Sequence, residues 1–387
     1  MGIRNLQIAM LVVAAFGSNL FGGLSSEIQE TCSLSLSQMS NIMSLSQAAN
    51  LISFLLLPLL VRQFGPYPLM IFGIVGSGLG LLGMGMSRTA YVFGFAFLFN
   101  TLMGYFYSTS NFTVLVRSDP KKIRTTVPLA HLTWSLASVA SGFYISLIKD
   151  DHWYRGYYQI AFVYAVMVVL FLFSASRAKK IPQMFSDTSE RKPFIHSFSL
   201  LKTKNFRLFF LYLILFNAVE YCCTVYTLLF LQKNLGASAK QIGLALSLMY
   251  LGSTLSRVFV IPIVRKSGTP FPLLQLLSAL SVFSILALSL GSSLIVAFSA
   301  MVVIGFSFGA LNPASQIVEI MCWPQEMDQI ANLHSISMVL GRMVLPSLFG
   351  VVSLYFSLQG GLVFLSLCMI FASFFLFLFK RLQSSYC

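Results

Sequence analysis

Three charged residues stand inside long apolar segments of the second half of the chain: Glu220, Arg257 and Arg342. A charge at the centre of a membrane-spanning helix costs about 2.5–3.5 kcal/mol on insertion scales, so such residues are rarely without function. Glu220 lies thirteen residues after Arg207, roughly 20 Å along a helix axis, and therefore near mid-membrane. Pairing with an arginine favours a charged carboxylate, and a dry unpaired site favours a protonated one. Glu220 is thus predicted to carry a coupled proton; a permanent structural ion pair is the alternative.

The charge balance of these residues bears on the substrate. Two arginines face one glutamate, which leaves a positive charge suited to a carboxylate or phosphate. This favours an organic anion or an amino acid slightly over a neutral sugar. The first half has no matching mid-segment charge, so charge chemistry is expected in one half only.

Polar side chains also recur at helical spacing. Asn100, Gly104, Tyr107 and Asn111 follow at i, i+4, i+7 and i+11 and therefore share one helix face. Unsatisfied amides cost several kcal/mol in lipid, so this face must meet protein or water. It is predicted to bind substrate, with interhelical hydrogen bonding as the alternative. The predicted substrate-binding residues are Asn19, Asn100, Tyr107, Asn111, Asn217, Tyr221, Arg257, Asn312, Gln316 and Arg342.

Two histidines, His131 and His334, begin apolar segments in similar context. A pH-responsive gate is one hypothesis, but the sequence favours histidines satisfied by a neighbouring carbonyl or loop. Glu319 lies near the end of its segment, where we expect an ion pair with Arg265 or Lys266 instead of a coupling role.

The segments that carry these residues are typical of membrane helices. Hydrophobic residues make up 57% of the 387-residue chain and charged residues 9%, whereas about a quarter would be charged in a soluble domain. Apolar runs of ~20 residues, enough to cross a ~30 Å hydrocarbon core, recur throughout. The predicted class is an all-α polytopic membrane protein. Its twelve expected spans are 5–26, 37–60, 67–86, 91–116, 126–148, 157–176, 206–231, 240–263, 271–290, 294–320, 330–355 and 360–379.

The net charge of +14 would suit a nucleic-acid partner, but the distribution of basic residues favours a role in orientation. With alternating loops, 18 of the 25 Lys and Arg residues fall on one side of the membrane and five on the other. The positive-inside rule then places both termini and the central linker in the cytoplasm. The expected partners are the lipid bilayer, a small-molecule substrate and protons, and no nucleic acid is expected. We expect a monomer, located in the plasma (bacterial inner) membrane.

The two halves of the chain are related. A shift of 203 places Gln38 on Gln241 and His131 on His334, and several matches near one offset indicate a duplication. The predicted organisation is two six-helix bundles in direct pseudo-twofold repeat: 1–176, a basic cytoplasmic linker at 177–205, and 206–387.

Six plus six spans with a long cytoplasmic linker resemble the major facilitator superfamily. Its signature loop between spans 2 and 3, G-x-x-x-D-R-x-G-R-K/R, is matched only in its glycine and basic character, and arginine stands where the family has aspartate. The resemblance implies alternating access around a midplane site lined by spans 1, 4, 7 and 10. It also implies a gating role for the residues of this loop. We extend this prediction to the nearby residues His131, His334 and Glu319. The two copies of the loop are Pro58-Leu-Leu-Val-Arg62-Gln-Phe-Gly65 and Ile261-Pro-Ile-Val-Arg265-Lys266-Ser-Gly268. The predicted gating residues are Arg62, Gly65, Arg265, Gly268, His131, His334 and Glu319.

The predicted function is a secondary active transporter of a small polar metabolite, with proton-coupled symport. The Leu-His pair and the cavity asparagines weakly resemble fucose-permease-like sugar transporters. The drug–proton antiporter motif G-x-x-x-G-P is absent, because Phe143 follows Gly142. A passive facilitator (uniporter) or an efflux antiporter on the same fold is the alternative. A lipid-modifying membrane enzyme is a more distant alternative. Such an enzyme would need clustered acidic residues, whereas the few acidic residues of the outer loops lie in separate loops.

No cofactor or metal is expected. The six cysteines form no CxxC motif, and the sequence has no histidine cluster. It also has no P-loop, so ATP is not expected to drive transport directly.

Overall fold

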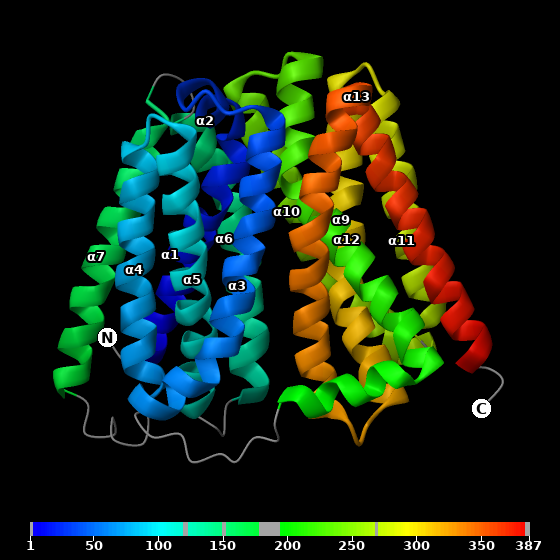
Figure 1. Ribbon diagram of the computed structural model, residues 1–387, viewed down its shortest axis with the longest axis horizontal. Helices are drawn as coiled ribbons and strands as arrows, with labels where there is room; N and C mark the ends of the chain where they lie inside the picture. The colour runs from blue at the N-terminus through cyan, green and yellow to red at the C-terminus, as the bar shows by residue number, and fades with distance from the viewer. Residues whose placement is uncertain (1–2, 119–122, 149–151, 178–193, 268–269, 384–387) are drawn as a thin grey trace. The chain divides into compact units, whose positions relative to one another are not determined.

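The computed structural model describes residues 3–118, 123–148, 152–177, 194–267 and 270–383. The chain folds into two compact units, Met1–Glu190 and Arg191–Cys387. Every regular element among the described residues is a helix. Unit 1 holds α1 (Ile3–Gly23), α2 (Ser25–Thr31), α3 (Leu36–Phe64), α4 (Pro66–Met86), α5 (Ala90–Ser118), α6 (Ile123–Ile148) and α7 (Tyr154–Arg177), coloured blue to green in Figure 1. Unit 2 holds η2 (Phe194–Lys202), α9 (Lys204–Leu235), α10 (Ala239–Ser267), α11 (Phe271–Leu290), α12 (Leu294–Cys322) and α13 (Met327–Gln383).

Ten helices of the described chain are long and apolar enough, by length and composition, to cross a membrane. One of them, α13, is interrupted by non-helical backbone at Phe356 and Ser357, and each of its parts exceeds ~20 residues. The 26-residue α6 is not among the ten, but it is likewise long enough to cross a membrane. All twelve segments expected from the sequence are therefore helical, and the predicted fold class is confirmed.

The internal packing of the two units follows the same scheme. In unit 1, α5 packs against α3 and α4, and α1 packs against α6; in unit 2, α12 packs against α10 and α11, and α9 packs against α13. The repeated glutamine also has one physical role in both copies. Gln38 Oε1 accepts a hydrogen bond from the Ser35 backbone nitrogen at the start of α3, and Gln241 Oε1 accepts one from the Ser238 nitrogen at the start of α10. The repeat therefore preserves a helix N-terminal cap.

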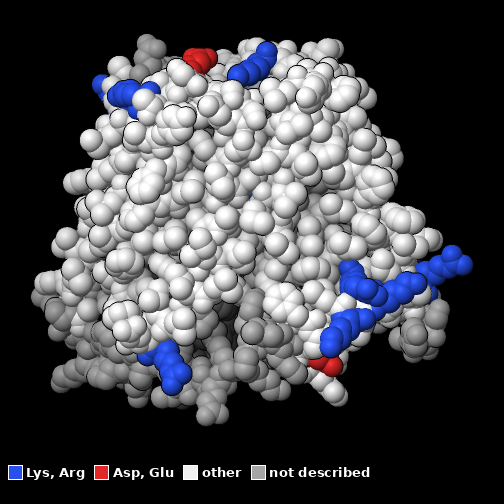
Figure 2. Space-filling view, in the orientation of Figure 1, with Lys and Arg blue, Asp and Glu red and all other residues white. Residues whose placement is uncertain are grey.

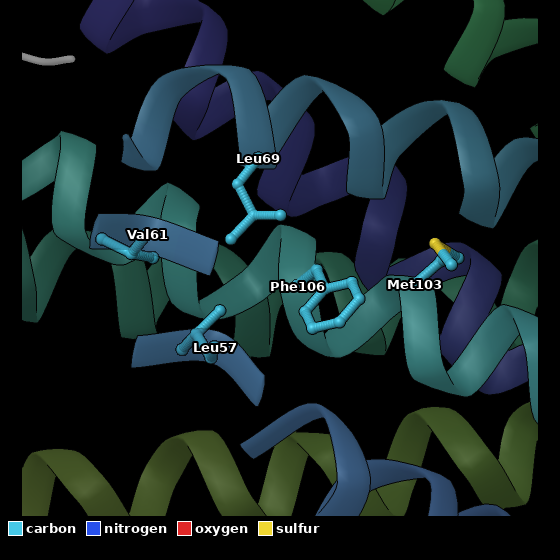
Figure 3. Packing of buried hydrophobic residues seen from close by; sticks show 5 residues of the cluster. All are labelled: Leu57, Val61, Leu69, Met103 and Phe106. Atoms are coloured by element: carbon cyan, nitrogen blue, oxygen red, sulfur yellow. The ribbon is translucent and has the colours of Figure 1, made fainter. Parts of the chain in front are cut away.

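The α3–α4 turn of unit 1 is fixed to α5 by a cluster of buried apolar side chains. Figure 3 shows the cluster, in which side chains from the three helices converge. In lipid, such side chains stabilise helix contacts through van der Waals packing, because lipid tails are as apolar as the side chains themselves. The members are Leu57, Val61, Leu69, Met103 and Phe106.

Aromatic rings join the helix ends of unit 2 next to the predicted linker. The Trp323 ring, just after α12, lies 5.1 Å from Phe206 and 5.8 Å from Phe209, both on α9, and 5.7 Å from Phe379 on α13, measured between ring centroids. Edge and offset contacts of this kind stabilise beyond the area that they bury. They hold the end of α12, the start of α9 and the end of α13 together.

The last third of the expected linker is a helix packed on unit 2. Residues 178–193 lie outside the described part of the chain, but η2 follows and contacts α9 and α13. Asn332 Nδ2 of α13 donates to Ser197 Oγ of η2 at 3.1 Å, and Ser197 is buried. The sequence analysis assigned this segment to the linker because it is rich in basic residues. Its short apolar stretch nevertheless packs against α9 and α13.

Charged side chains gather at the ends of the helices. On the face shown in Figure 2, the Lys, Arg, Asp and Glu side chains of the described residues lie near the upper and lower ends, with a broad band of uncharged residues between them. This distribution suits helices that cross a hydrocarbon layer.

Candidate functional site

Unit 2 contains a cavity between α9, α10 and α12, with about 310 Å³ of empty space including its open mouth. Its wall combines a carboxylate, a thiol, hydroxyl groups and apolar side chains. The lining residues are Glu220, Cys223, Thr224, Met249, Tyr250, Ser253, Ile304, Gly305, Phe308 and Gly309. Glu220, predicted as the proton carrier, lies in this wall.

One wall of the cavity depends on close contact between α10 and α12. A Cβ atom added at Gly305 would lie 1.8 Å from the Met249 carbonyl oxygen, so only glycine permits this approach. Gly305 and Gly309 form a small-xxx-small pattern, which lets membrane helices approach closely. The sequence analysis did not identify Gly309, Cys223 or Met249 for this site; the four-residue spacing between Gly305 and Gly309 was the available signal for Gly309.

Arg342 meets Glu220 across the α9–α13 contact. Arg342 Nη2 lies 3.3 Å from Glu220 Oε2, and Nε donates to the Asn217 carbonyl oxygen at 3.5 Å. The guanidinium carbon lies 5.6 Å from the ring centroid of Tyr221, within cation–π range. The two charged side chains are 24% and 27% exposed within the described chain. The structure thus brings together four residues predicted for the site.

A glycine beside Arg342 explains how the side chain reaches α9. A Cβ atom at Gly341 would lie 2.2 Å from the Ile214 carbonyl oxygen, so α13 meets α9 in direct backbone contact there. The sequence analysis did not identify Gly341, although a glycine next to an arginine in the middle of a span can indicate close helix packing.

Arg257 completes the charged cluster. It lies on α10 and interacts electrostatically with Glu220 and with Tyr250, a residue of the cavity wall. Glu220 interacts with both Arg342 and Arg257. The cluster therefore combines two cations with one carboxylate, as the sequence predicted.

The predicted polar residues of unit 1 contact neighbouring helices of the same unit. Asn19 Nδ2 donates to Ser141 Oγ of α6 at 2.9 Å, and Asn100 Nδ2 donates to the Ser77 carbonyl oxygen of α4 at 2.8 Å. Tyr107 is buried against α4, near Gly73. These contacts match the packing alternative for this face, and substrate binding by these residues stays a prediction.

Asn111 is buried beside α1, where Gln7 Nε2 donates to its backbone carbonyl oxygen at 3.1 Å. Its side-chain oxygen has no hydrogen-bond partner among the described residues. Gln7, fully buried, was missed by sequence reasoning, because a glutamine one turn from the start of a helix gives no distinctive signal.

Two predicted binding residues of α12 lie beyond the cavity wall. Gln316 Nε2 donates to Asn312 Oδ1 at 3.2 Å, and Gln316 is exposed. Their one-turn spacing makes this a local contact on the helix surface, and their role in binding stays a prediction.

Glu319 has a different contact from the expected loop ion pair. Its Oε1 lies 2.6 Å from His334 Nδ1, and both side chains are buried between α12 and α13. The side chains of Arg265 and Lys266, and all of Gly268, lie outside the described residues. The expected ion pair with Arg265 or Lys266 therefore stays a prediction, and the described structure adds His334 as a contact of Glu319.

Of the remaining predicted gating residues, Arg62 and Gly65 lie at the end of α3, and His131 lies about two turns inside α6. His131 and Arg62 are exposed, and Gly65 lies between α3 and α4. The two histidines that the repeat aligns thus have different surroundings, one exposed and one buried with a carboxylate. Among the described residues, no group of three or more His, Cys, Asp or Glu side chains could hold a metal ion.

Two bundles of long apolar helices, one with a charged cavity, define a polytopic membrane transporter. The chain belongs to the Major Facilitator Superfamily, whose family model matches residues 8–346. It is therefore a secondary transporter and not an enzyme, as predicted.

Solved structures of this superfamily share the fold. The nucleoside transporter NupG matches with a TM-score of 0.80 and 12% identity, over 98% of this chain and 100% of that chain. A bacterial homolog of the human lysosomal transporter Spinster, inward-facing and occupied, gives 0.80 and 12% over 98% and 96%. A POT family transporter in complex with 5-aminolevulinic acid gives 0.79 and 12% over 98% and 96%. At such identities the likeness concerns the fold alone, and no curated protein matches the sequence.

Proposed function

We propose that this protein is a proton-coupled symporter that moves a small polar metabolite across the plasma membrane, with Glu220 as the proton carrier. The observation that carries the proposal is the position of Glu220, which lines a cavity and lies 3.3 Å from the Arg342 guanidinium. A carboxylate in this place can alternate between a charged, paired form and a protonated, unpaired form.

The contacts of Arg342 support a switchable pair over a permanent one. Breaking a buried ion pair usually leaves a stranded charge at a cost of about 3–5 kcal/mol. Here Arg342 also contacts the Asn217 carbonyl oxygen and the Tyr221 ring, so it keeps two partners when Glu220 takes up a proton. Glu220 lines an open cavity and both side chains are partly exposed, which supports the proposal that protons reach the carboxylate from this cavity.

We propose the orientation from the basic residues, with both termini and the linker in the cytoplasm. The protein is proposed to act as a monomer and to alternate access to its substrate site. Asn19, Asn100, Tyr107, Asn111, Asn312 and Gln316 remain proposed contributors to binding, and Arg62, Gly65, Arg265 and Gly268 remain proposed gating residues.

Uptake by proteoliposomes tests this function. Radiolabelled sugars, amino acids and organic acids are offered with and without an inward proton gradient. The symporter accumulates its substrate only with the gradient, whereas a passive facilitator equilibrates it in both conditions and an antiporter responds to the reversed gradient.

The Glu220→Gln variant then tests the proton carrier. Glutamine keeps the shape of glutamate but cannot release a proton, so accumulation should be lost while substrate exchange between equal pH values remains. Glu30→Gln, a change at an exposed residue of α2, is the matched control and should transport normally. Accumulation that still follows the pH gradient in a stable Glu220→Gln protein would rule out the proton role.

A further inference from the structure

The short helix η2 lies across one end of unit 2. Figure 1 shows it in green, directly after the grey trace, at a steep angle to the long helices that it meets. It contacts α9 and α13, and Asn332 Nδ2 of α13 donates to Ser197 Oγ of η2 at 3.1 Å. Ser197 is buried, whereas the next side chain, Phe198, is 42% exposed. One side of η2 is therefore docked on the bundle, and its outer side presents an aromatic ring.

The turn from η2 into α9 holds three cations in fixed positions. The Thr203 backbone nitrogen and Oγ1 both donate to the Leu200 carbonyl oxygen, at 3.1 Å and 2.8 Å. The Arg207 backbone nitrogen donates to the Thr203 carbonyl oxygen at 3.1 Å, so α9 continues directly from this turn. Lys202 and Lys204 flank Thr203, and both side chains are exposed, as is that of Arg207.

The end of α13 brings two further cations to the same place. The ring of Phe209, on the first turns of α9, lies 5.1 Å from the ring of Phe379 on α13, measured between centroids. Lys380 and Arg381 follow Phe379 directly in the chain. Figure 2 shows basic side chains gathered at this end of unit 2. The basic surface of unit 2 consists of Lys202, Lys204, Arg207, Lys380 and Arg381.

This surface carries more positive charge than the acidic residues near it can balance. In the described part of unit 2, the acidic residues of the connection between α12 and α13 are Glu319, Glu326 and Asp328. Glu319 is buried against His334. Even with Glu326 and Asp328 both turned toward the surface, two carboxylates would face five cations. The surface therefore favours an anionic partner.

The basic surface also stands at the end of an apolar stripe. Leu367, Ile370, Phe374 and Phe377 of α13 are each 47% to 52% exposed, and they follow at i, i+3, i+7 and i+10. Arg381 continues the same helix face at i+14. A stripe of this kind suits lipid tails, and a cation at its end suits the depth of the headgroups. A phospholipid can contact both parts, whereas a soluble anion can contact only the cations.

We infer that the basic surface of unit 2 binds an anionic phospholipid, whose phosphate contacts the cations and whose acyl chains lie along the apolar stripe of α13. This inference goes beyond the proposed transport function and depends neither on the substrate nor on Glu220. Basic residues at a membrane surface each strengthen the attraction to anionic lipid by about fivefold in affinity. Salt screens this attraction.

A lipid titration of the purified full-length protein tests the binding. The unfolding temperature in a neutral detergent is recorded against the mole fraction of phosphatidylglycerol or of phosphatidylcholine with identical acyl chains. Phosphatidylglycerol should raise the unfolding temperature at lower mole fractions, because a ligand that binds the folded state stabilises it. The difference between the lipids should shrink when sodium chloride is raised from about 0.05 M to about 0.5 M. Equal effects of the two lipids, or a preference that salt does not change, would overturn the inference.

A pair of double variants locates the site. Lys202→Gln with Lys204→Gln should weaken the apparent affinity for phosphatidylglycerol roughly twenty-five-fold and leave phosphatidylcholine unchanged. The matched control is Lys233→Gln with Lys240→Gln, which removes the same charge from exposed residues at the opposite end of unit 2 and should keep the preference. A full preference in folded Lys202→Gln/Lys204→Gln protein would refute the site. If this double variant does not fold, each single variant should lose about fivefold, and an unchanged affinity in both would refute the site equally.

Glycerol 3-phosphate separates a lipid site from a simple phosphate site. It carries the phosphate of the headgroup but no acyl chain. At the same concentration as the lipid, it should neither raise the unfolding temperature nor reduce the effect of phosphatidylglycerol. Stabilisation by glycerol 3-phosphate equal to that by the lipid would show that the surface binds soluble phosphates, and the assignment to a phospholipid would be wrong.

Discussion

His334 Nδ1 lies 2.6 Å from Glu319 Oε1, so the first turns of α13 are joined to the last turn of α12 inside unit 2. The two side chains are only 7% and 5% exposed. The Glu220–Arg342 pair is longer and about a quarter exposed. Unit 2 thus contains a short, buried pair beside the connection between two helices and a longer, partly exposed pair at a cavity. The buried pair suits a structural role, and the partly exposed pair suits the proposed exchange of a proton.

The Glu319–His334 contact should stabilise unit 2. Glu319→Gln replaces the carboxylate by a weaker amide acceptor, and His334→Asn removes the ring nitrogen that contacts Glu319, so each change should cost about 1–3 kcal/mol. The double variant should lose less than the sum of the single losses, because the partners act together. Thermal unfolding of the purified protein in detergent measures these effects.

The aligned histidine of unit 1 supplies the control. His131 is exposed, and His131→Asn should leave the unfolding temperature within experimental scatter of the wild type. Additive losses in the double variant would show that Glu319 and His334 do not act as a pair.

The sequence predicted the helices well, because long apolar runs have few alternatives in a membrane. It also predicted the meeting of Glu220 with Arg342 or Arg257, since a carboxylate and cations inside apolar segments have few other partners. Neither inference required knowledge of how the helices are rotated.

The partners of the other polar residues could not be predicted in this way. The spacing of Asn100, Gly104 and Tyr107 shows that they share a face, but it does not show which neighbour that face meets. Backbone contact between helices selects the neighbour, as Gly73 of α4 does beside Tyr107. The Glu319–His334 contact depends in the same way on the rotation of two helices.

The close approach of α10 and α12 should be needed for the cavity. Gly305→Ala places a Cβ atom 1.8 Å from the Met249 carbonyl oxygen, so the helices must separate or the protein must lose stability. Overpacking of this kind typically costs about 1–3 kcal/mol. The variant should unfold at a lower temperature and bind substrate weakly.

A glycine with free space provides the comparison. A Cβ atom at Gly104 of α5 would meet only Ser77 Oγ at 3.7 Å, an ordinary van der Waals distance. Gly104→Ala should therefore keep the unfolding temperature of the wild type. Equal behaviour of the two alanine variants would mean that close α10–α12 contact is not required.

The membrane orientation can be tested with two matched cysteine variants. Thr203 lies between η2 and α9, at the linker end, and Thr89 lies between α4 and α5; both are exposed. With a cytoplasmic linker, an impermeant maleimide added to intact cells should label Thr89→Cys but not Thr203→Cys. The native thiol nearest to Thr89 in the chain, Cys32, should contribute little background. It is buried, and burial raises the pKa of this thiol more than the nearby Arg88 lowers it, so little reactive thiolate forms near neutral pH.

Permeabilised cells provide the positive control, because both introduced cysteines should then be labelled. Raising the external pH should increase labelling of Thr89→Cys before any labelling of Cys32, since the exposed thiol ionises at lower pH than the buried one. Labelling of Thr203→Cys from outside, with Thr89→Cys protected, would reverse the orientation. The basic residues would then mark the outer surface, contrary to the positive-inside rule.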